Sequence, residues 1–146
     1  MKHFIDLSDF NNTKLDAIVN KAKQIKKNPN KYSSKCKDKT LGMIFQKDST
    51  RTRVSFSVGF LKLGGKIIEL NSNSIGFGKR ESNEDIIKAL SQFINVLMIR
   101  NDDHNIIRNL SSLNALPIIN GLSDFSHPCQ ILSDMFTINE LIGNIK

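Results

Sequence analysis

Apolar residues recur along this chain with two spacings, one typical of helices and the other of buried strands. Residues 8–27 place apolar side chains near the 3.6-residue helical period, and Ser8 is a residue type that caps helices, so a surface helix is expected there. Four later runs have the length and composition of buried strands, at residues 41–45, 66–70, 96–99 and 116–119. Helical stretches follow these runs, at residues 52–63, 82–93, 104–113 and about 128–142.

Strands therefore alternate with helices through most of the chain, and such alternation implies a parallel sheet joined by right-handed crossovers. We expect an α/β fold in which helices cover both faces of a central parallel four-stranded sheet. A loop at residues 28–34, where Pro29 cannot continue a helix, separates the first helix from this unit. At 146 residues the chain has the length of one domain, so residues 1–146 are expected to form one.

In sheets of this kind, ligands bind outside the carboxyl ends of the strands. The loops that follow the expected strands should therefore share one rim. They lie at residues 46–52, 71–82, 100–104 and 120–130. Polar and charged side chains in these loops are the first candidates for a binding site.

Composition excludes several classes of protein. No stretch approaches the roughly 20 apolar residues that cross a bilayer. The first residues, 1–4, lead into polar sequence without a signal or transit segment, so a cytoplasmic protein without membrane contact is expected. Cys36 and Cys129 stand far apart without neighbours typical of metal sites, which favours two reduced thiols over a disulfide or a zinc site.

The net charge of +7 favours anionic partners, and residues 1–40 hold ten lysines against four aspartates. Nucleic-acid binding would need clustered cations with exposed aromatic residues or a known motif. Here the lysines are spread along a helix and Tyr32 is the sole tyrosine. We therefore favour a solvated basic face and expect no nucleic-acid partner, although a non-catalytic anion- or nucleic-acid-binding domain stays the alternative of another class.

The first candidate motif is Ser49-Thr50-Arg51-Thr52-Arg53, between an expected strand and an expected helix. The start of a helix offers free N–H groups and the positive end of the helix dipole, and hydroxyl and guanidinium groups add donors to an oxyanion. These residues predict a phosphate cradle without a glycine run. On chemistry alone, a capped helix with two solvated arginines fits equally well.

The second motif is His127-Pro128-Cys129-Gln130, after the fourth expected strand. His127 and Gln130 carry donors for a carbonyl oxygen or an amide, and Pro128 fixes the turn. A lone histidine is more often structural, so this motif gains weight from its place on the rim. Arg100 follows the third expected strand and can reach the same centre.

In this order and on this strand pattern, the two motifs and Arg100 resemble the carbamoyl-phosphate domain of aspartate and ornithine carbamoyltransferases. The resemblance begins at residues 2–7 and covers nearly the whole chain. Residues 120–124, ahead of His127, and a cysteine at position 129 are similar to ornithine rather than aspartate enzymes. Ornithine is therefore the favoured acceptor, with aspartate or another amine as the alternative.

The resemblance implies that Ser49, Thr50, Arg51 and Thr52 bind the phosphate of carbamoyl phosphate. Arg51 would be the principal countercharge, and Thr52 would also lie near the carbamoyl oxygen. Arg53 would support the loop rather than touch the ligand.

For the carbamoyl group, the resemblance implies that Arg100 bridges phosphate and carbonyl oxygens and that His127 hydrogen-bonds the carbonyl oxygen. Gln130 and the region of Pro128 and Cys129 would hold the amide. Arg51, Arg100 and His127 would be the catalytic residues. The family requires no metal or organic cofactor, and it implies a homotrimer that works in arginine biosynthesis or in ornithine and citrulline metabolism.

Two departures from the family stand out. Ornithine enzymes often carry a glutamine that reaches a neighbouring subunit's site, and the aligned residue here is Gly76. Ser74, Lys79 or Arg80 would be the substitute for this contact between subunits. The alternative is that the loop is flexible and solvated and makes no such contact. The family's Asp-Ser-Met-Gly and His-Cys-Leu-Pro motifs, which belong to a second domain for the amino acid, are absent. We therefore expect a carbamoyl-phosphate-binding half that is inactive alone, its last helix leading toward the absent domain.

Overall fold

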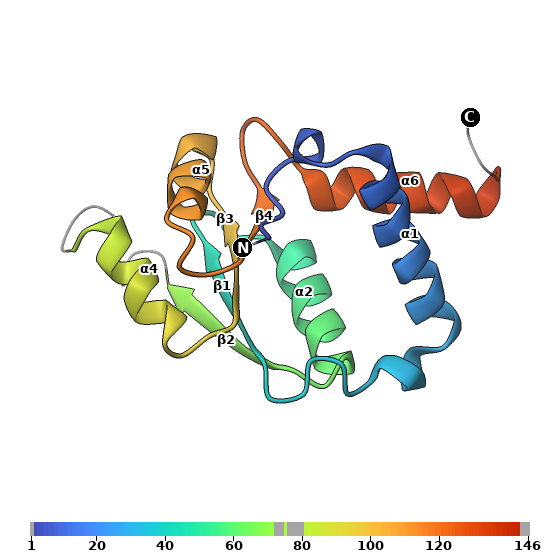
Figure 1. The fold of residues 1–146 in the computed structure, drawn as a ribbon, viewed down its shortest axis with the longest axis horizontal. Helices are drawn as coiled ribbons and strands as arrows, with labels where there is room; N and C mark the ends of the chain where they lie inside the picture. The colour runs from blue at the N-terminus through green and yellow to red at the C-terminus, as the bar shows by residue number, and fades with distance from the viewer. Residues whose placement is uncertain (1, 72–74, 76–80, 144–146) are drawn as a thin grey trace.

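The computed structural model describes residues 2–71, 75 and 81–143. Its centre is a sheet of four parallel strands in the order β2-β1-β3-β4 (Figure 1). The strands are β1 (Thr40–Phe45), β2 (Lys66–Asn71), β3 (Val96–Arg100) and β4 (Ile118–Leu122). The expected α/β fold with a parallel four-stranded sheet is confirmed.

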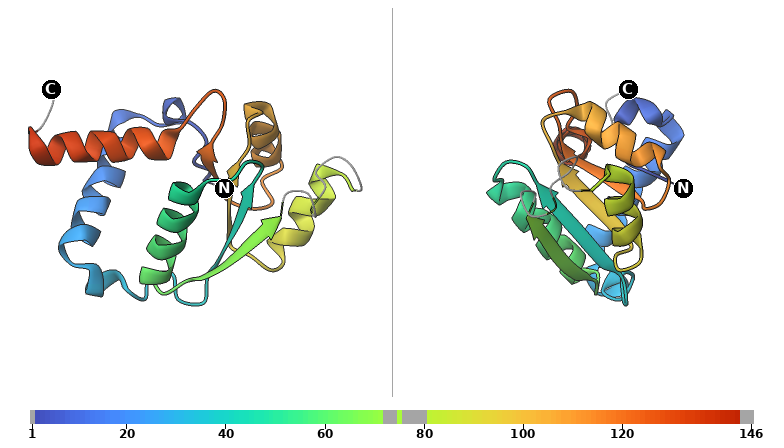
Figure 2. Two further views of the ribbon diagram at one scale, coloured as in Figure 1. Left: turned by 180° about the vertical axis from the view of Figure 1, so that it is seen from behind. Right: turned by 90° about the vertical axis from the view of Figure 1, so that its left-hand side faces the viewer.

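The helices flank this sheet on both sides (Figures 1 and 2). The α-helices are α1 (Asn12–Lys27), α2 (Thr50–Lys62), α4 (Asn83–Ser91), α5 (His104–Ser112) and α6 (Pro128–Leu141). Two 3₁₀ helices, η1 (Leu7–Asp9) and η2 (Pro29–Tyr32), stand at the two ends of α1. Helix η2 occupies the segment where a plain loop was expected.

One face of the sheet packs against α4 and α5. Ile87 of α4 and Ile107 of α5 are fully buried there against Leu97 and Ile118 of the strands. Such contacts remove apolar surface from water, which stabilises the fold by about 25 cal/mol for each Å² buried. Burial of this face fixes β3 and β4, whose ends carry two of the candidate site regions.

The opposite face packs against α2. Met43 and Met98 are buried between the sheet and Phe56 and Phe60, which lie one helical turn apart on α2. This packing fixes the side of α2 that faces the sheet. The first turn of α2, which carries the first motif, is thereby brought to the carboxyl end of β1.

The first helix begins later than predicted. Asn11 caps α1, and its side-chain oxygen accepts the Lys14 N–H at 3.0 Å. Ser8 does not cap it, because Ser8 lies within η1. Asp6 accepts the Ser8 N–H and forms a capping box with Asp9 at the start of η1. Asp6, rather than Ser8, therefore starts the first helical turn.

The fourth strand is shifted relative to the expected residues 116–119. The Asn120 N–H donates to the Phe4 carbonyl at 2.8 Å, and the Phe4 N–H donates to the Ile118 carbonyl at 2.8 Å. The N-terminal segment thus covers the outer edge of β4. Because that partner lies far away in sequence, local propensity missed that Asn120 and Gly121 belong to the strand.

Among the residues that the structure describes, no helix combines the length and the apolar character that membrane crossing requires.

Candidate functional site

A cavity of about 310 Å³ lies between the first turns of α2 and α6. Its lining residues come from the two candidate motifs and the turns that follow them: Arg51, Thr52, Ser55, Phe56, His127, Cys129, Gln130 and Ser133. Segments nearly 80 positions apart therefore meet at one place on the predicted rim.

The α2 side of this cavity is a helix start without an internal acceptor. Ser49 is the N-cap in extended conformation, with φ −150° and ψ 97°, and its side chain makes no capping hydrogen bond. Its carbonyl accepts the Arg53 N–H at 3.1 Å, which starts the helix. The first N–H groups of α2 therefore lack a side-chain acceptor, and the positive end of the helix dipole is open to an anion.

The two arginines of the motif have different surroundings. Arg51 is exposed, lines the cavity and has no hydrogen bond or ion pair with any described residue. Arg53 is held by Glu69, Asp48 and the ring of Phe45. Arg51 is thus the cation that remains available to a ligand, while the Arg53 charge is already matched.

His127 is the N-cap of α6, where Pro128 occupies the first helical position and is buried. The His127 Nδ1 atom is buried and has no hydrogen-bond partner among the described residues. Burial lowers the pKa of His127, the nearby Arg100 charge lowers it further, and Asp134 partly opposes both effects. The imidazole is therefore neutral at pH 7, and one of its nitrogens is a donor.

Arg100 is the last residue of β3 rather than the first residue after it. Its carbonyl accepts the Gln46 N–H at 2.9 Å, which ties the ends of β3 and β1 together. Its Nε is buried without a partner in the described part of the chain. Arg100 pairs with Leu122 across a register shift between β3 and β4, and irregularities of this kind are common beside active sites.

Cys129 and Gln130 form the rest of the α6 side. The Cys129 thiol donates to the Asn120 carbonyl at 3.5 Å, and burial raises the Cys129 pKa to about 11. Cys129 is therefore a protonated thiol at neutral pH and not a nucleophile. Gln130 Nε2 donates to Asp134 Oδ1 at 2.8 Å, which leaves the Gln130 side-chain oxygen as an acceptor.

The loop that precedes His127 is held by a buried amide. Asn120 Nδ2 donates to the Ser126 carbonyl at 3.2 Å and to the Ile5 carbonyl at 3.0 Å. Ser123 Oγ lies 2.8 Å from His104 Nδ1, and it accepts the Ser126 N–H at 3.1 Å. These bonds fix the loop backbone, so the position of His127 is determined before a ligand arrives.

The cavity unites part of the predicted site. Arg51, Thr52, His127, Cys129 and Gln130 line it, whereas Ser49, Thr50, Arg100 and Pro128 lie at its border elements without lining it. The predicted trans-subunit position Gly76, and its substitutes Ser74, Lys79 and Arg80, lie outside the described residues.

Three lining residues were not predicted: Ser55, Phe56 and Ser133. Ser55 and Phe56 stand four positions after Arg51 and Thr52, and Ser133 stands three after Gln130. Residues with these spacings share a helix face. Helical periodicity applied to the two motifs would have found them.

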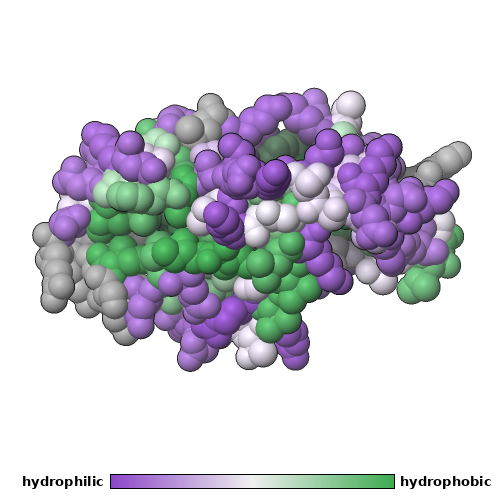
Figure 3. All heavy atoms as spheres, turned by 90° about the horizontal axis from the view of Figure 1, so that it is seen from below, coloured by the Kyte–Doolittle hydropathy of each residue, from purple (hydrophilic) through white to green (hydrophobic). Residues whose placement is uncertain are grey.

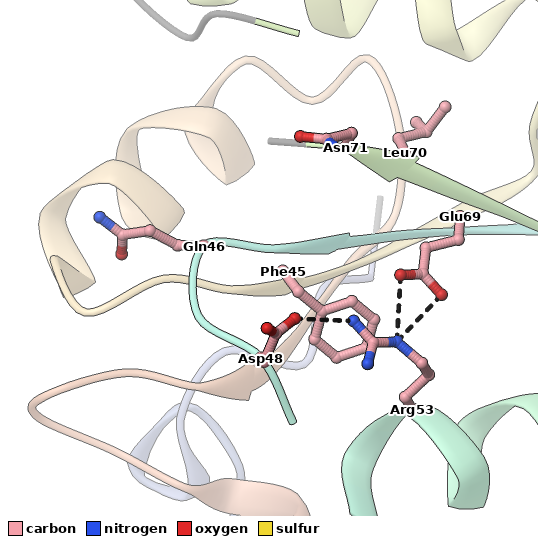
Figure 4. Close-up of a pocket in the computed structure, with 7 residues that line it drawn as sticks. All are labelled: Phe45, Gln46, Asp48, Arg53, Glu69, Leu70 and Asn71. Atoms are coloured by element: carbon pink, nitrogen blue, oxygen red, sulfur yellow. Dashed lines mark hydrogen bonds and ion pairs between the residues drawn. The ribbon is translucent and has the colours of Figure 1, made fainter. Parts of the chain in front are cut away.

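A second, larger cavity of about 500 Å³ contains the Arg53 side chain in its lining (Figure 4). Its lining residues are Phe45, Gln46, Asp48, Arg53, Glu69, Leu70 and Asn71. Although larger, it suits a phosphate less well, because Asp48 and Glu69 already neutralise its arginine. In the described part of the chain, no group of three or more histidine, cysteine or acidic residues is arranged to hold a metal ion.

Comparison with known proteins gives a consistent relationship. Residues 2–140 match the family model described as the carbamoyl-P binding domain of aspartate/ornithine carbamoyltransferase. The ornithine carbamoyltransferase of Acinetobacter baylyi is 39% identical over 148 aligned positions, which cover 100% of this chain and 48% of the relative. That of Campylobacter fetus is 41% identical with the same coverage. The chain spans about half the length of the curated relatives it matches.

Solved structures agree with this relationship. The ornithine carbamoyltransferase of Pyrococcus furiosus superposes with a TM-score of 0.94 at 40% identity, over 99% of this chain and 47% of that one. The Burkholderia thailandensis structure gives 0.92 at 33% identity, over 100% and 51%. Because the family model extends over nearly all of its residues, the chain belongs to the aspartate/ornithine carbamoyltransferase family.

Proposed function

We propose that this chain binds carbamoyl phosphate and acts as the carbamoyl-phosphate-binding half of an ornithine carbamoyltransferase, which forms L-citrulline and phosphate from carbamoyl phosphate and L-ornithine. The observation that carries the proposal is the set of side-chain nitrogens without hydrogen-bond partners around one rim. Arg51 has no partner in the described residues, and the Arg100 Nε and His127 Nδ1 atoms are buried without one. Buried nitrogens without partners are costly, and an oxyanion ligand would satisfy them.

The reaction places negative charge at two successive positions. The neutral amine nitrogen attacks the carbonyl carbon, a C–N bond forms, the C–O bond to phosphate breaks, and the proton that the amine loses passes to the departing phosphate, directly or through water. Charge grows first on the carbonyl oxygen and then on the departing phosphate. Preorganised donors at both positions are each typically worth about 3–4 kcal/mol.

The two sides of the cavity suit these two positions. The hydroxyls and N–H groups of residues 49–52, with the free Arg51 cation, would hold the phosphate. His127 would donate to the carbonyl oxygen, Arg100 would lie between the two groups, and Gln130 and the backbone at Cys129 would hold the amide. Because burial and Arg100 lower the pKa of His127 in the ligand-free chain, the neutral imidazole is the favoured form at pH 7, and its role would be to donate a hydrogen bond.

Ornithine is the proposed acceptor because the relatives at 39% and 41% identity are named ornithine carbamoyltransferases. Aspartate is the alternative. Incubation of the chain with labelled carbamoyl phosphate and either amino acid would give only trace product, and citrulline would dominate that trace. Carbamoyl-aspartate as the main product would reverse the choice of acceptor, and fast turnover would show that these residues hold a complete site.

The binding step has a direct test. Carbamoyl phosphate is titrated calorimetrically into the parent chain, into Arg51→Ala, and into Lys62→Ala, which removes an equal charge from the far end of α2. Arg51→Ala should weaken binding about tenfold or more, as loss of a charged hydrogen bond predicts, and Lys62→Ala should not. Equal affinity of the parent and Arg51→Ala for carbamoyl phosphate would contradict the proposed phosphate site at residues 49–52.

We further propose a homotrimer, a cytoplasmic location and a role in arginine biosynthesis or in ornithine and citrulline metabolism. Apolar side chains gather in a band across the lower side of the molecule (Figure 3). On α2, Val54, Val58 and Leu61 are exposed at helical spacing, a feature typical of association surfaces. Light scattering of the purified chain tests the assembly, and a monomeric mass at all concentrations would contradict it.

A further inference from the structure

Arg53 is fixed from three directions in the larger cavity (Figure 4). Its Nε lies 3.0 and 3.1 Å from the two carboxylate oxygens of Glu69 on β2. Its Nη2 donates to Asp48 Oδ1 at 3.3 Å, and its guanidinium carbon stands 4.8 Å from the centre of the Phe45 ring. One side chain of α2 is thereby attached to the ends of both β1 and β2.

These three contacts differ in strength. The Asp48 side chain is fully exposed, so solvent screens its pair with Arg53. The Arg53 and Glu69 side chains are 33% and 44% exposed, and Nε is shared between both oxygens of one carboxylate. Phe45 is buried in the sheet core and presents a fixed ring face. Glu69 is therefore the polar group that holds Arg53 in place over that ring.

Arg53 and Arg51 stand two positions apart in the first turn of α2, and residues at this spacing point to different sides of a helix. Arg53 points toward β1 and β2, whereas Arg51 lines the cavity that contains His127. Holding the one arginine thus sets the rotation of the turn that carries the other.

We propose that Glu69 is a positioning residue for the anion-binding turn of α2. By fixing Arg53 against Phe45, it determines where Arg51 and Thr52 lie in front of His127. This inference rests on the proposed binding of carbamoyl phosphate, and Glu69 itself touches no ligand.

The direction in which anion affinity changes when the Glu69 carboxylate is removed distinguishes a positioning role from a purely electrostatic one. Removing a carboxylate near an anion site makes the surroundings more positive, which by charge alone would tighten anion binding. Loss of positioning weakens binding instead, because Arg51 and Thr52 no longer stand in the productive arrangement.

The test is a calorimetric titration of carbamoyl phosphate into the parent, Glu69→Gln and Glu84→Gln. Glu84 is the matched control, because it forms an exposed pair with Lys88 on α4 and its substitution changes the charge equally. Glu69→Gln should weaken binding about fivefold or more, since displaced binding groups lose affinity steeply, and Glu84→Gln should leave it unchanged. Binding by folded Glu69→Gln that equals or exceeds that of the parent would overturn the inference.

An NMR measurement without ligand tests the same idea independently. In Glu69→Gln the Arg53 Nε–H resonance and the backbone amides of residues 50–52 should shift, and in Glu84→Gln they should not. Arg53→Lys, which lacks the planar guanidinium, should shift the same amides. Adding Arg53→Lys to Glu69→Gln should weaken carbamoyl phosphate binding little beyond the loss that Glu69→Gln causes alone. Unmoved amides in Glu69→Gln would refute positioning. A parent chain that fails to bind while these shifts occur would instead refute the proposed function.

Discussion

At the scale of single residues, the surroundings of a side chain decide its role more than its type does. Arg51 and Arg53 are both arginines of one motif, yet Arg51 has no partner among the described residues, whereas Arg53 is held by Glu69 and Phe45. Cys129 and His127 both stand at the start of α6. Burial keeps the first a protonated thiol and the second a neutral imidazole, and so excludes thiolate chemistry there.

The His127 imidazole should titrate below the ordinary value of 6.5, because burial and the Arg100 charge disfavour its protonated form. Asp134→Asn should lower the midpoint further, since the Asp134 carboxylate opposes that shift, and Arg100→Gln should raise it. NMR titration of the imidazole protons in the three proteins measures these midpoints. A parent midpoint above 6.5 would contradict the burial of the His127 imidazole.

At the scale of elements, β4 shows how a distant partner defines a strand. Asn120 and Gly121 are residues that usually avoid strand interiors, yet they continue β4 because Phe4 supplies hydrogen bonds along its edge. A Cβ added at Gly121 would stand 2.4 Å from Met98 Sδ and 3.3 Å from the Ile99 carbonyl. The glycine therefore allows β4 to approach β3 closely, just before the loop that leads to His127.

Gly121→Ala should lower the free energy of unfolding by about 1–3 kcal/mol, because the added methyl group overpacks the core beside Met98. Gly59→Ala is the matched control: it lies in α2, a Cβ there has nothing within 4 Å, and the change should stabilise the helix by about 0.5–1 kcal/mol. Urea unfolding of the three proteins measures both effects. Equal stability of Gly121→Ala and the parent would place residue 121 outside a packed strand.

At the scale of the whole molecule, the N-terminal segment joins parts that are distant in sequence. Phe4 pairs with β4, and Arg108 of α5 makes two hydrogen bonds to Asp9 at 3.0 and 2.9 Å. The nearby Ser126 and Ser8 hydroxyls lower the pKa of Asp6 from 3.8 to about 2, and the Ser8 hydroxyl donates to Asp6 Oδ1 at 2.6 Å. The first residues thus hold the loop before His127, and site geometry is coupled to overall folding.

The Asp6 carboxylate should contribute stability that is present above pH 3.8 and is lost as the pH falls toward 2, because its folded pKa lies below the unfolded value. The free energy of unfolding of Asp6→Asn should therefore fall less between pH 5 and pH 2 than that of the parent. Asp16→Asn, on the exposed surface of α1, should follow the parent. Denaturant unfolding across this pH range measures the difference, and identical curves for Asp6→Asn and the parent would contradict the lowered pKa of Asp6.

The sequence by itself determined the alternation of strands and helices, the parallel sheet and the family, because apolar periodicity and the motifs at residues 49–53 and 127–130 are local properties. It also placed both motifs on one rim. Only the tertiary structure decided the extent of β4 and the different fates of Arg51 and Arg53, because these depend on Phe4, Glu69 and Phe45. Such partners are brought near by chain folding, and no local pattern encodes which distant group will match a strand edge or a buried charge.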